Sequence, residues 1–346
     1  MPNTSPNTST VKRFQEKRES VSQKAHCDFG LFAGATSQNS EQLLLMEKEE
    51  ACCGIKIFMG SSTGDLLVAE DNFLEKVLQT GSRMISVHCE DEGLLKERKE
   101  IAIKEAHPKA HPQWRNEETA LRATQRIVEL AKKWQRRIHT LHITTAEELQ
   151  YLSQNKDIVS VEILPQHMYF KAPDCYEKLG SLAQMNPPIR HEKHQLAIKE
   201  ALRSGIVDVV ASDHAPHTLE EKQKTYPQSP SGLTGVQTIV PVMLNFVNQG
   251  LLDIPHLIRL MNINPCRIFS VKNKGGIFIG QDADFTIIDK NKTRKVDNQW
   301  IQSRAGWSPY HGEALTGWPV MTMIRGHLVM KEDQILKKIG KAIHFA

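Results

Sequence analysis

A strand-like run that ends in a carboxylate and two imidazoles carries the strongest chemical signal in the chain. The apolar residues 209–211 and Ser212 lead into Asp213-His214-Ala215-Pro216-His217, and the proline prevents the strand from continuing its ladder. In α/β barrels, polar residues at the carboxyl ends of buried parallel strands lie on the face that carries the chemistry. Asp213 is therefore the first candidate catalytic residue. On this segment alone, a turn with two surface histidines remains the alternative.

Three other apolar runs contain or end in a polar residue. Lys56 lies within the run 54–60, and His88 and His142 follow strand-like residues. A lysine inside a buried strand is unfavourable unless it is modified or paired; the alternatives are an edge-strand lysine that points to solvent and hydrogen-bonded histidines without a metal. On one sheet, these residues and Asp213 would converge at one rim. Imidazoles and oxygen donors suit Zn²⁺, and Lys56 fits such a site only if its charge is changed.

The segments that must position these residues alternate between strand and helix patterns. The clearest helix is expected at 117–134, where apolar residues recur with a period of 3.6. Repeated βα units predict an α/β fold with a parallel sheet, open or closed into a barrel. Six strands, not eight, are expected, at 27–34, 54–60, 84–89, 138–143, 158–164 and 207–211.

The last quarter of the chain has a different pattern. A loop is expected at 218–234, followed by helices to about residue 269. The stretch 275–289 alternates apolar and turn residues, and 320–330 predicts a strand pair around Gly326. We therefore expect two parts, a (β/α) barrel over 1–272 and a small β unit with a surface tail over 273–346.

Composition excludes several classes of function. The chain has 346 residues, a formal net charge of +4 and no dense Lys/Arg block, so a nucleic-acid partner is not indicated. Its six cysteines include no C-x-x-C pair and fit reduced thiols better than a disulfide framework. Residues 1–10 do not form a signal peptide, and no stretch is long and apolar enough to span a membrane. A cytoplasmic location without membrane attachment is expected.

Several motifs together resemble a known family, the dihydroorotases of the amidohydrolase superfamily. They follow the family's order over nearly the whole chain, and the Asn-Pro-Pro and Asp-His-Ala-Pro-His motifs are the most specific. The matching stretches are Met1-Pro2-Asn3-Thr4, Gly54-Ile55-Lys56, Val87-His88-Cys89-Glu90, Leu141-His142-Ile143-Thr144-Thr145, Met185-Asn186-Pro187-Pro188-Ile189-Arg190, Ser212-Asp213-His214-Ala215-Pro216-His217 and Gly280-Gln281-Asp282-Ala283-Asp284.

The resemblance implies a fold, a metal centre and a chemistry. The fold is a (β/α)8 TIM-type barrel of the metal-dependent amidohydrolase kind, with two zinc ions per complete site. Carboxylation would make Lys56 a bridging carbamate, which resolves the difficulty with its charge. By the same resemblance, His88 and His142 hold one zinc, and Asp213 binds the other and transfers the proton.

The resemblance also implies a substrate. In the family, dihydroorotate is formed reversibly from N-carbamoyl-L-aspartate, a step of pyrimidine biosynthesis. The positions that match its substrate-binding residues are Asn3, Asn186, His217, Ser231 and Gly232. Hydantoinase and allantoinase chemistry are the nearest alternatives, and for Asn186 a turn role before two prolines stays open. A homodimer or a transcarbamoylase partner is the expected assembly.

One family motif has no counterpart in the sequence. The family's first barrel strand ends in His-x-His-x-Arg, which supplies two ligands of the second zinc and a substrate-binding arginine; no such motif occurs here. Met1-Pro2-Asn3 corresponds to the end of the second barrel strand, so we expect the sequence to begin inside a longer protein. The alternative is an inactive, truncated chain that serves as a structural partner. Gln166-His167 also replaces the usual pair of histidines.

Overall fold

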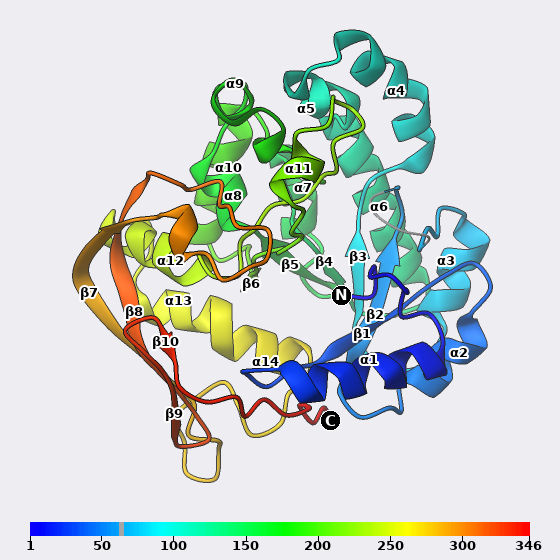
Figure 1. Cartoon of the computed structure of the whole chain (residues 1–346). Helices are drawn as coiled ribbons and strands as arrows, with labels where there is room; N and C mark the ends of the chain where they lie inside the picture. The colour runs from blue at the N-terminus through cyan, green and yellow to red at the C-terminus, as the bar shows by residue number, and fades with distance from the viewer. Residues whose placement is uncertain (62–65) are drawn as a thin grey trace.

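A sheet of six parallel strands forms the centre of the molecule (Figure 1). The structure is a computed structural model that describes residues 1–61 and 66–346. The strands lie side by side in the order of the sequence, from β1 at one edge to β6 at the other. Their bounds are β1 Leu31–Gly34, β2 Cys52–Phe58, β3 Ile85–His88, β4 Ile138–Thr140, β5 Val159–Ile163 and β6 Val209–Val210.

Helices follow nearly every strand, as a parallel sheet requires. Helix α6 shows why they form: Asn116 caps its first turn, acidic residues lie in that turn and Lys132 and Lys133 lie in the last, which suits the helix dipole. The helices are α1 Val11–Lys24, α2 Ser40–Met46, α3 Asp71–Leu78, α4 Glu92–Glu105, α5 His111–Trp114, α6 Glu117–Lys133, α7 Ala146–Ser153, α8 Pro165–Tyr169, α9 Asp174–Leu179, α10 Glu192–Arg203, α11 Leu219–Lys222, α12 Ile239–Asn248, α13 Ile254–Ile258 and α14 Asn264–Ile268.

The six expected strands are confirmed, with somewhat shorter bounds than the patterns indicated. Within the described residues, β1 and β6 are the two edges of the sheet and are not paired with each other. Every residue of β2 is buried, because β1 and β3 pair with it on both sides. In this register Lys56 lies opposite Ser86, and Phe58 opposite His88.

The second sheet is antiparallel and lies beside the barrel, at the left in Figure 1. It consists of β7 Phe285–Lys295, β8 Ala314–Ile324, β9 His327–Lys331 and β10 Gln334–Ile335. The expected strand pair around Gly326 is β8 and β9. Helix α12 packs on β8 so closely that a Cβ on Gly317, whose φ is +100°, would lie 2.6 Å from the Leu244 Cβ. The boundary at residue 272 stays a prediction.

Three local expectations need correction. The loop expected at 218–234 contains helix α11, which begins with a capping box from Thr218 and Glu221. The stretch 275–284 is not a strand; β7 begins only at Phe285. The tail is not a free extension, because it docks along residue 29 at the barrel edge: the Phe29 N–H donates to Lys341 O and the Ile343 N–H to Phe29 O, both at 2.9 Å.

No helix in the described part of the chain is long and apolar enough to cross a membrane.

Candidate active site

A pocket of about 80 Å³ lies at the carboxyl ends of the parallel strands and collects the residues singled out by the sequence. Of the nine predicted site residues, His217 alone does not line it, but His217 lies next to the wall: a Cβ on Gly232 would be 3.1 Å from the His217 Cδ2. The eight that line it are Asn3, Lys56, His88, His142, Asn186, Asp213, Ser231 and Gly232.

His88 and His142 face each other across neighbouring strands. His88 Nδ1 lies 3.2 Å from His142 Nε2, and both rings are buried. Burial lowers the pKa of both imidazoles, so both are neutral at pH 7, the form that binds metals. In a tetrahedral zinc site with Zn–N bonds of about 2.0 Å, two nitrogen ligands are roughly 3.3 Å apart. The pair therefore fits one shared metal ion.

A buried ion pair orients His88. The Glu90 Oε2 lies 2.9 Å from His88 Nε2, and Arg115 donates to the same carboxylate from Nη2 at 2.7 Å and from Nε at 3.1 Å. Burial alone would raise the pKa of Glu90, but the Arg115 charge and His88 hold it far below its usual range. A carboxylate behind a metal-binding histidine fixes its ring and tautomer. Sequence reasoning missed both residues, although Glu90 belongs to the quoted Val87–Glu90 motif.

Lys56 is buried in an inner strand, so the edge-strand alternative is wrong. Its Nζ lies 4.4 Å from the centre of the Phe58 ring. Burial lowers the pKa of Lys56 to about 8, while the charges of Asp213 and Glu162 oppose this shift. A larger neutral fraction of the amine is what addition of CO₂ requires. Glu162, which also lines the pocket, was not predicted, because the strand pattern of residues 158–164 alone does not show which way its side chain points.

Two of the predicted ligands adopt strained backbone conformations. His142 has φ +38° and Asp213 has φ +39°, in the left-handed region that residues other than glycine rarely occupy. Such strain persists where the surrounding structure holds it and is concentrated at functional sites. Burial raises the pKa of Asp213 to about 6, against the opposing charge of Lys56. At neutral pH Asp213 is thus a carboxylate that accepts a proton readily.

His111 positions Asn186 at the wall of the pocket. The His111 Nε2 lies 2.9 Å from Asn186 Oδ1, and its Nδ1 lies 3.1 Å from the Tyr226 hydroxyl. Burial lowers the pKa of His111 to about 3, so it acts as a neutral ring that donates to the amide oxygen and accepts from the tyrosine. The Asn186 side chain is therefore held at the pocket wall by a specific contact, and its role in binding substrate stays a prediction.

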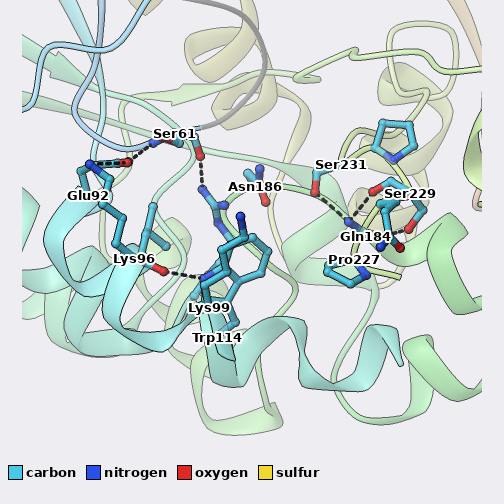
Figure 2. A pocket seen from close by; sticks show the side chains of 14 residues that line it. Ser61, Glu92, Lys96, Lys99, Trp114, Gln184, Asn186, Pro227, Ser229 and Ser231 are labelled. Carbon is cyan, nitrogen blue, oxygen red and sulfur yellow. Dashed lines mark hydrogen bonds and ion pairs between the residues drawn. The ribbon is translucent and has the colours of Figure 1, made fainter. Parts of the chain in front are cut away.

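A second, larger pocket of about 380 Å³ opens beside the first (Figure 2). Both pockets have Asn186 and Ser231 in their walls. One side is formed by helix α4 with Lys96 and Lys99, and the opposite side by the loop that carries Ser229 (Figure 2). Lys96 is paired with Glu92 in the same wall, and Lys99 and Arg115 leave the outer pocket with an excess of positive charge beside the inner one.

Among the described residues, one group of three carboxylates also has metal-ligand spacing, but it lies elsewhere. Asp28, Asp282 and Asp284 present oxygen atoms within 4.8 Å of one another. The ammonium group of Lys274 lies among them, 2.8 Å from Asp28, 2.8 Å from Asp282 and 2.5 Å from Asp284. This lysine supplies the positive charge that a metal would bring.

Comparison with known proteins identifies the class. Residues 32–329 match the amidohydrolase family. The chain is 33% identical to a dihydroorotase of Methanosphaera stadtmanae over 99% of this chain and 79% of that protein, and 34% identical to one of Pyrococcus furiosus over 98% and 73%. The L-hydantoinase (dihydropyrimidinase) structure from Arthrobacter aurescens superposes with a TM-score of 0.95 at 29% identity, over 99% of this chain and 79% of that one.

The fold and the matched residues together define an enzyme class: the chain belongs to the amidohydrolase family. Within that family it resembles the dihydroorotases over nearly its whole length, and it is a cyclic amidohydrolase. A more distant likeness, at 17% identity with a TM-score of 0.69, is to the inactive dihydroorotase-like domain of a Chaetomium thermophilum CAD-like multifunctional protein. That likeness concerns the fold alone.

Proposed function

We propose that the protein is a zinc-dependent dihydroorotase that interconverts N-carbamoyl-L-aspartate and dihydroorotate in pyrimidine biosynthesis, in the cytoplasm. The observation that carries the proposal is the inner pocket. It brings four candidate metal ligands together with Asn3, Asn186 and the 231–232 backbone, in a chain that resembles dihydroorotases from end to end.

The residues present fit a metal centre. His88 and His142 would hold one zinc ion, with Lys56 as a carbamate, and Asp213 would be one ligand of a second. When bound, zinc lowers the pKa of water and polarises the scissile carbonyl. The Lys56 ammonium loses one proton to become the neutral amine, and the amine joins CO₂ with release of a second proton. A buried cation is thereby converted into an anionic oxygen ligand. The lowered pKa of Lys56 favours this reaction.

Asp213 would move the proton. During hydrolysis a water oxygen bonds to the ring carbonyl carbon, and the carbon–nitrogen bond of the cyclic amide breaks. The Asp213 carboxylate accepts the proton from the water and passes it to the leaving nitrogen. A pKa of about 6 suits both steps near neutral pH. In the reverse direction the same residue removes the proton from the ureido nitrogen.

Asn3, Asn186, His217, Ser231 and Gly232 would bind the substrate. Its carboxylate and ureide groups need donors and acceptors at the wall of a small pocket, and amide side chains with backbone groups supply both. The preset orientation of Asn186 by His111 reduces the ordering that binding requires. The positive charge of Lys99 in the outer pocket favours the approach of an anionic substrate.

Hydrolysis of dihydroorotate by the zinc-loaded protein tests the proposal. We expect Asp213→Asn to lower kcat by at least about 100-fold, because general acid–base catalysis contributes on that order. The matched variant Asp174→Asn, whose side chain is 65% exposed in α9, should retain the rate. Equal rates in the two variants, or faster turnover of hydantoin or allantoin than of dihydroorotate, would contradict the proposal.

A second candidate is a non-catalytic structural partner of aspartate transcarbamoylase. The observation that favours it is the ligand set of the inner pocket: Lys56, His88, His142 and Asp213 would supply one nearly complete zinc site and only half of a second. It predicts co-purification with the transcarbamoylase and no zinc-dependent turnover of dihydroorotate. Zinc-dependent turnover that Asp213→Asn abolishes would exclude it.

A further inference from the structure

Lys222 is a buried lysine that the proposed reaction does not use. Burial lowers its pKa to about 7, so it is largely charged only below that pH. It is the last residue of α11, and its side chain is 1% exposed. Its Nζ donates to three backbone carbonyls, those of Pro230 at 2.8 Å and of Gln184 and Gly232 at 3.1 Å each. No carboxylate in the described part of the chain forms an ion pair with it. A fully buried, unpaired lysine is rare and unfavourable unless its hydrogen bonds are satisfied.

The three carbonyls belong to two segments that border the candidate active site. Gln184 precedes Asn186, and residues 230–232 contain Ser231 and Gly232 in the pocket wall. One ammonium group thus joins the two segments that supply the predicted substrate contacts. All three of its N–H donors are used, so Lys222 is not placed to act as a nucleophile or a base.

The Gln184 side chain reinforces the same connection (Figure 2). Its Nε2 donates to Ser229 O at 2.9 Å and to Ser231 Oγ at 3.1 Å, while its Oε1 accepts from Ser229 Oγ at 2.7 Å. In the backbone, the Gly232 N–H donates to Gln184 O at 2.9 Å. Hydrogen bonds to both its side chains and its carbonyl groups therefore hold the 229–232 loop in place.

Gly232 shows why the loop must be held closely. A Cβ at this position would lie 2.4 Å from Ala215 O, in the segment that follows Asp213. On the far side, Lys222 Nζ lies 5.8 Å from the Trp307 ring centre, and Trp307 Nε1 donates to His217 O at 2.7 Å. A shift of the loop would disturb the neighbours of both Asp213 and His217.

We propose that Lys222 and Gln184 form a clasp, in which the ammonium group presets the 229–232 backbone so that Ser231 and Gly232 face the pocket before substrate binds. Lys222 is then a positioning residue, and its charge acts on substrate affinity rather than on the chemical step. The effect on substrate affinity rests on the proposed dihydroorotase function. The effect on the loop does not.

The test compares Lys222→Ala with Lys222→Met in the zinc-loaded protein. Alanine leaves a space in which an ammonium ion can meet the three carbonyls, whereas methionine keeps the apolar stem and fills it. We expect Lys222→Ala to raise KM for dihydroorotate about 10-fold with a smaller change in kcat, since the loop would lose three hydrogen bonds to a charged group. Ammonium chloride should lower the raised KM of Lys222→Ala and leave that of Lys222→Met unchanged. Choline chloride at equal ionic strength should change the KM of neither variant.

Amide hydrogen exchange of residues 229–233 gives a readout that needs no substrate. We expect faster exchange at Gly232 in both variants and slower exchange on adding ammonium chloride to Lys222→Ala. Lys224→Ala, at an exposed position two residues on, is the matched control. If the wild type does not hydrolyse dihydroorotate, the proposed function fails while the exchange result still decides the clasp.

Two results would overturn the clasp. One is unchanged exchange at Gly232 in Lys222→Met, which has lost the charge and kept the stem. The other is wild-type behaviour of Lys222→Met together with no ammonium effect on Lys222→Ala, because the side chain would then act by packing alone. If Lys222→Ala folds only in ammonium chloride, the charge is needed to order the loop and the clasp is supported. If Lys222→Ala folds in neither ammonium chloride nor choline chloride, hydrogen exchange at Gly232 in Lys222→Met decides.

Discussion

Two clusters of charged and polar residues have the composition of a metal site, and they differ in whether their charges are already balanced. Beside the β unit, Asp28, Asp282 and Asp284 surround the Lys274 ammonium. In the inner pocket, His88 and His142 face each other as neutral rings with ring nitrogens 3.2 Å apart. The first cluster has the better ligand spacing, yet the second is the candidate metal site.

The spacing of potential ligand atoms alone therefore does not define a metal centre. Three carboxylates with their own ammonium form a complete ion-pair network, so a cation there would have to displace a charge that the chain supplies. Two buried neutral imidazoles beside a strained carboxylate have unused binding capacity. The ion pair of Glu90 and Arg115 lies behind His88, where it supports the histidine without occupying the pocket.

Removing a pocket histidine tests the comparison most strongly. We expect His88→Ala to weaken zinc binding by more than about 100-fold, because losing a ligand exceeds the 10–100-fold effect of losing an outer partner. Competition with a chelator measures this affinity. Asp282→Asn in the other cluster, and His327→Ala on the exposed β9, should bind zinc as the wild type does. Loss of zinc in Asp282→Asn would mean that the wrong cluster was chosen.

Changing the support behind the histidine should have a smaller effect. Glu90→Gln removes the charge that orients His88 and leaves Arg115 buried without its partner. We expect zinc affinity to fall about 10-fold and the free energy of unfolding to fall by about 3 kcal/mol, measured by chelator competition and urea unfolding. Glu97→Gln on the exposed face of α4 is the control. An unchanged zinc affinity would show that Glu90 serves stability alone.

The neutral histidines near the pocket predict a dependence of stability on pH. The pKa of His111 is lowered to about 3, so between pH 3 and about 6.5 the unfolded chain binds a proton that the folded chain does not. Stability from this residue is therefore present above pH 6.5 and is lost as the pH falls. At pH 5 the loss for one such group is about 2 kcal/mol.

Urea unfolding at pH 7.5 and pH 5 measures this loss. His111→Gln should show less of it, because glutamine does not titrate, whereas His327→Gln should behave as the wild type. An equal pH dependence in all three proteins would rule out His111 as a source of the effect.

The balanced cluster should give the smallest change. Lys274→Met removes its cation and leaves three carboxylates, so we expect the free energy of unfolding to fall by about 1 kcal/mol with no loss of zinc. Lys272→Met, two residues away and exposed, is the control. Millimolar Ca²⁺ should restore part of the stability of Lys274→Met and add nothing to the wild type, since the variant keeps only Arg325, which pairs with Asp28, and has no cation shared by all three carboxylates. A fall in zinc content would mean that the two clusters are linked.

Much of the fold followed from local patterns. Short apolar runs and intervening amphipathic helices predicted six parallel strands in sequence order, because periodicity and turn chemistry are local properties. The same patterns indicated that Lys56, His88, His142 and Asp213 would meet, since parallel strands bring their carboxyl ends to one edge. The docked tail escaped prediction because its contacts come from distant segments. The short helix α11 does have a local signal, the capping box of Thr218 and Glu221, which the loop expected at 218–234 overlooked.

The residues that complete and support the site are determined by contacts between segments that are distant in the sequence. Three of these residues, Glu162, Arg115 and Lys222, have partners 20 or more residues away, so their spacing carries no signal. Glu90 lies two residues from His88, but its ion pair with Arg115 is a long-range contact. Whether a charged side chain is solvated, paired or buried depends on neighbours that packing brings together. The sequence by itself therefore determined the strands and their candidate ligands, and the packing decided their charge states, because burial and long-range contacts set pKa values.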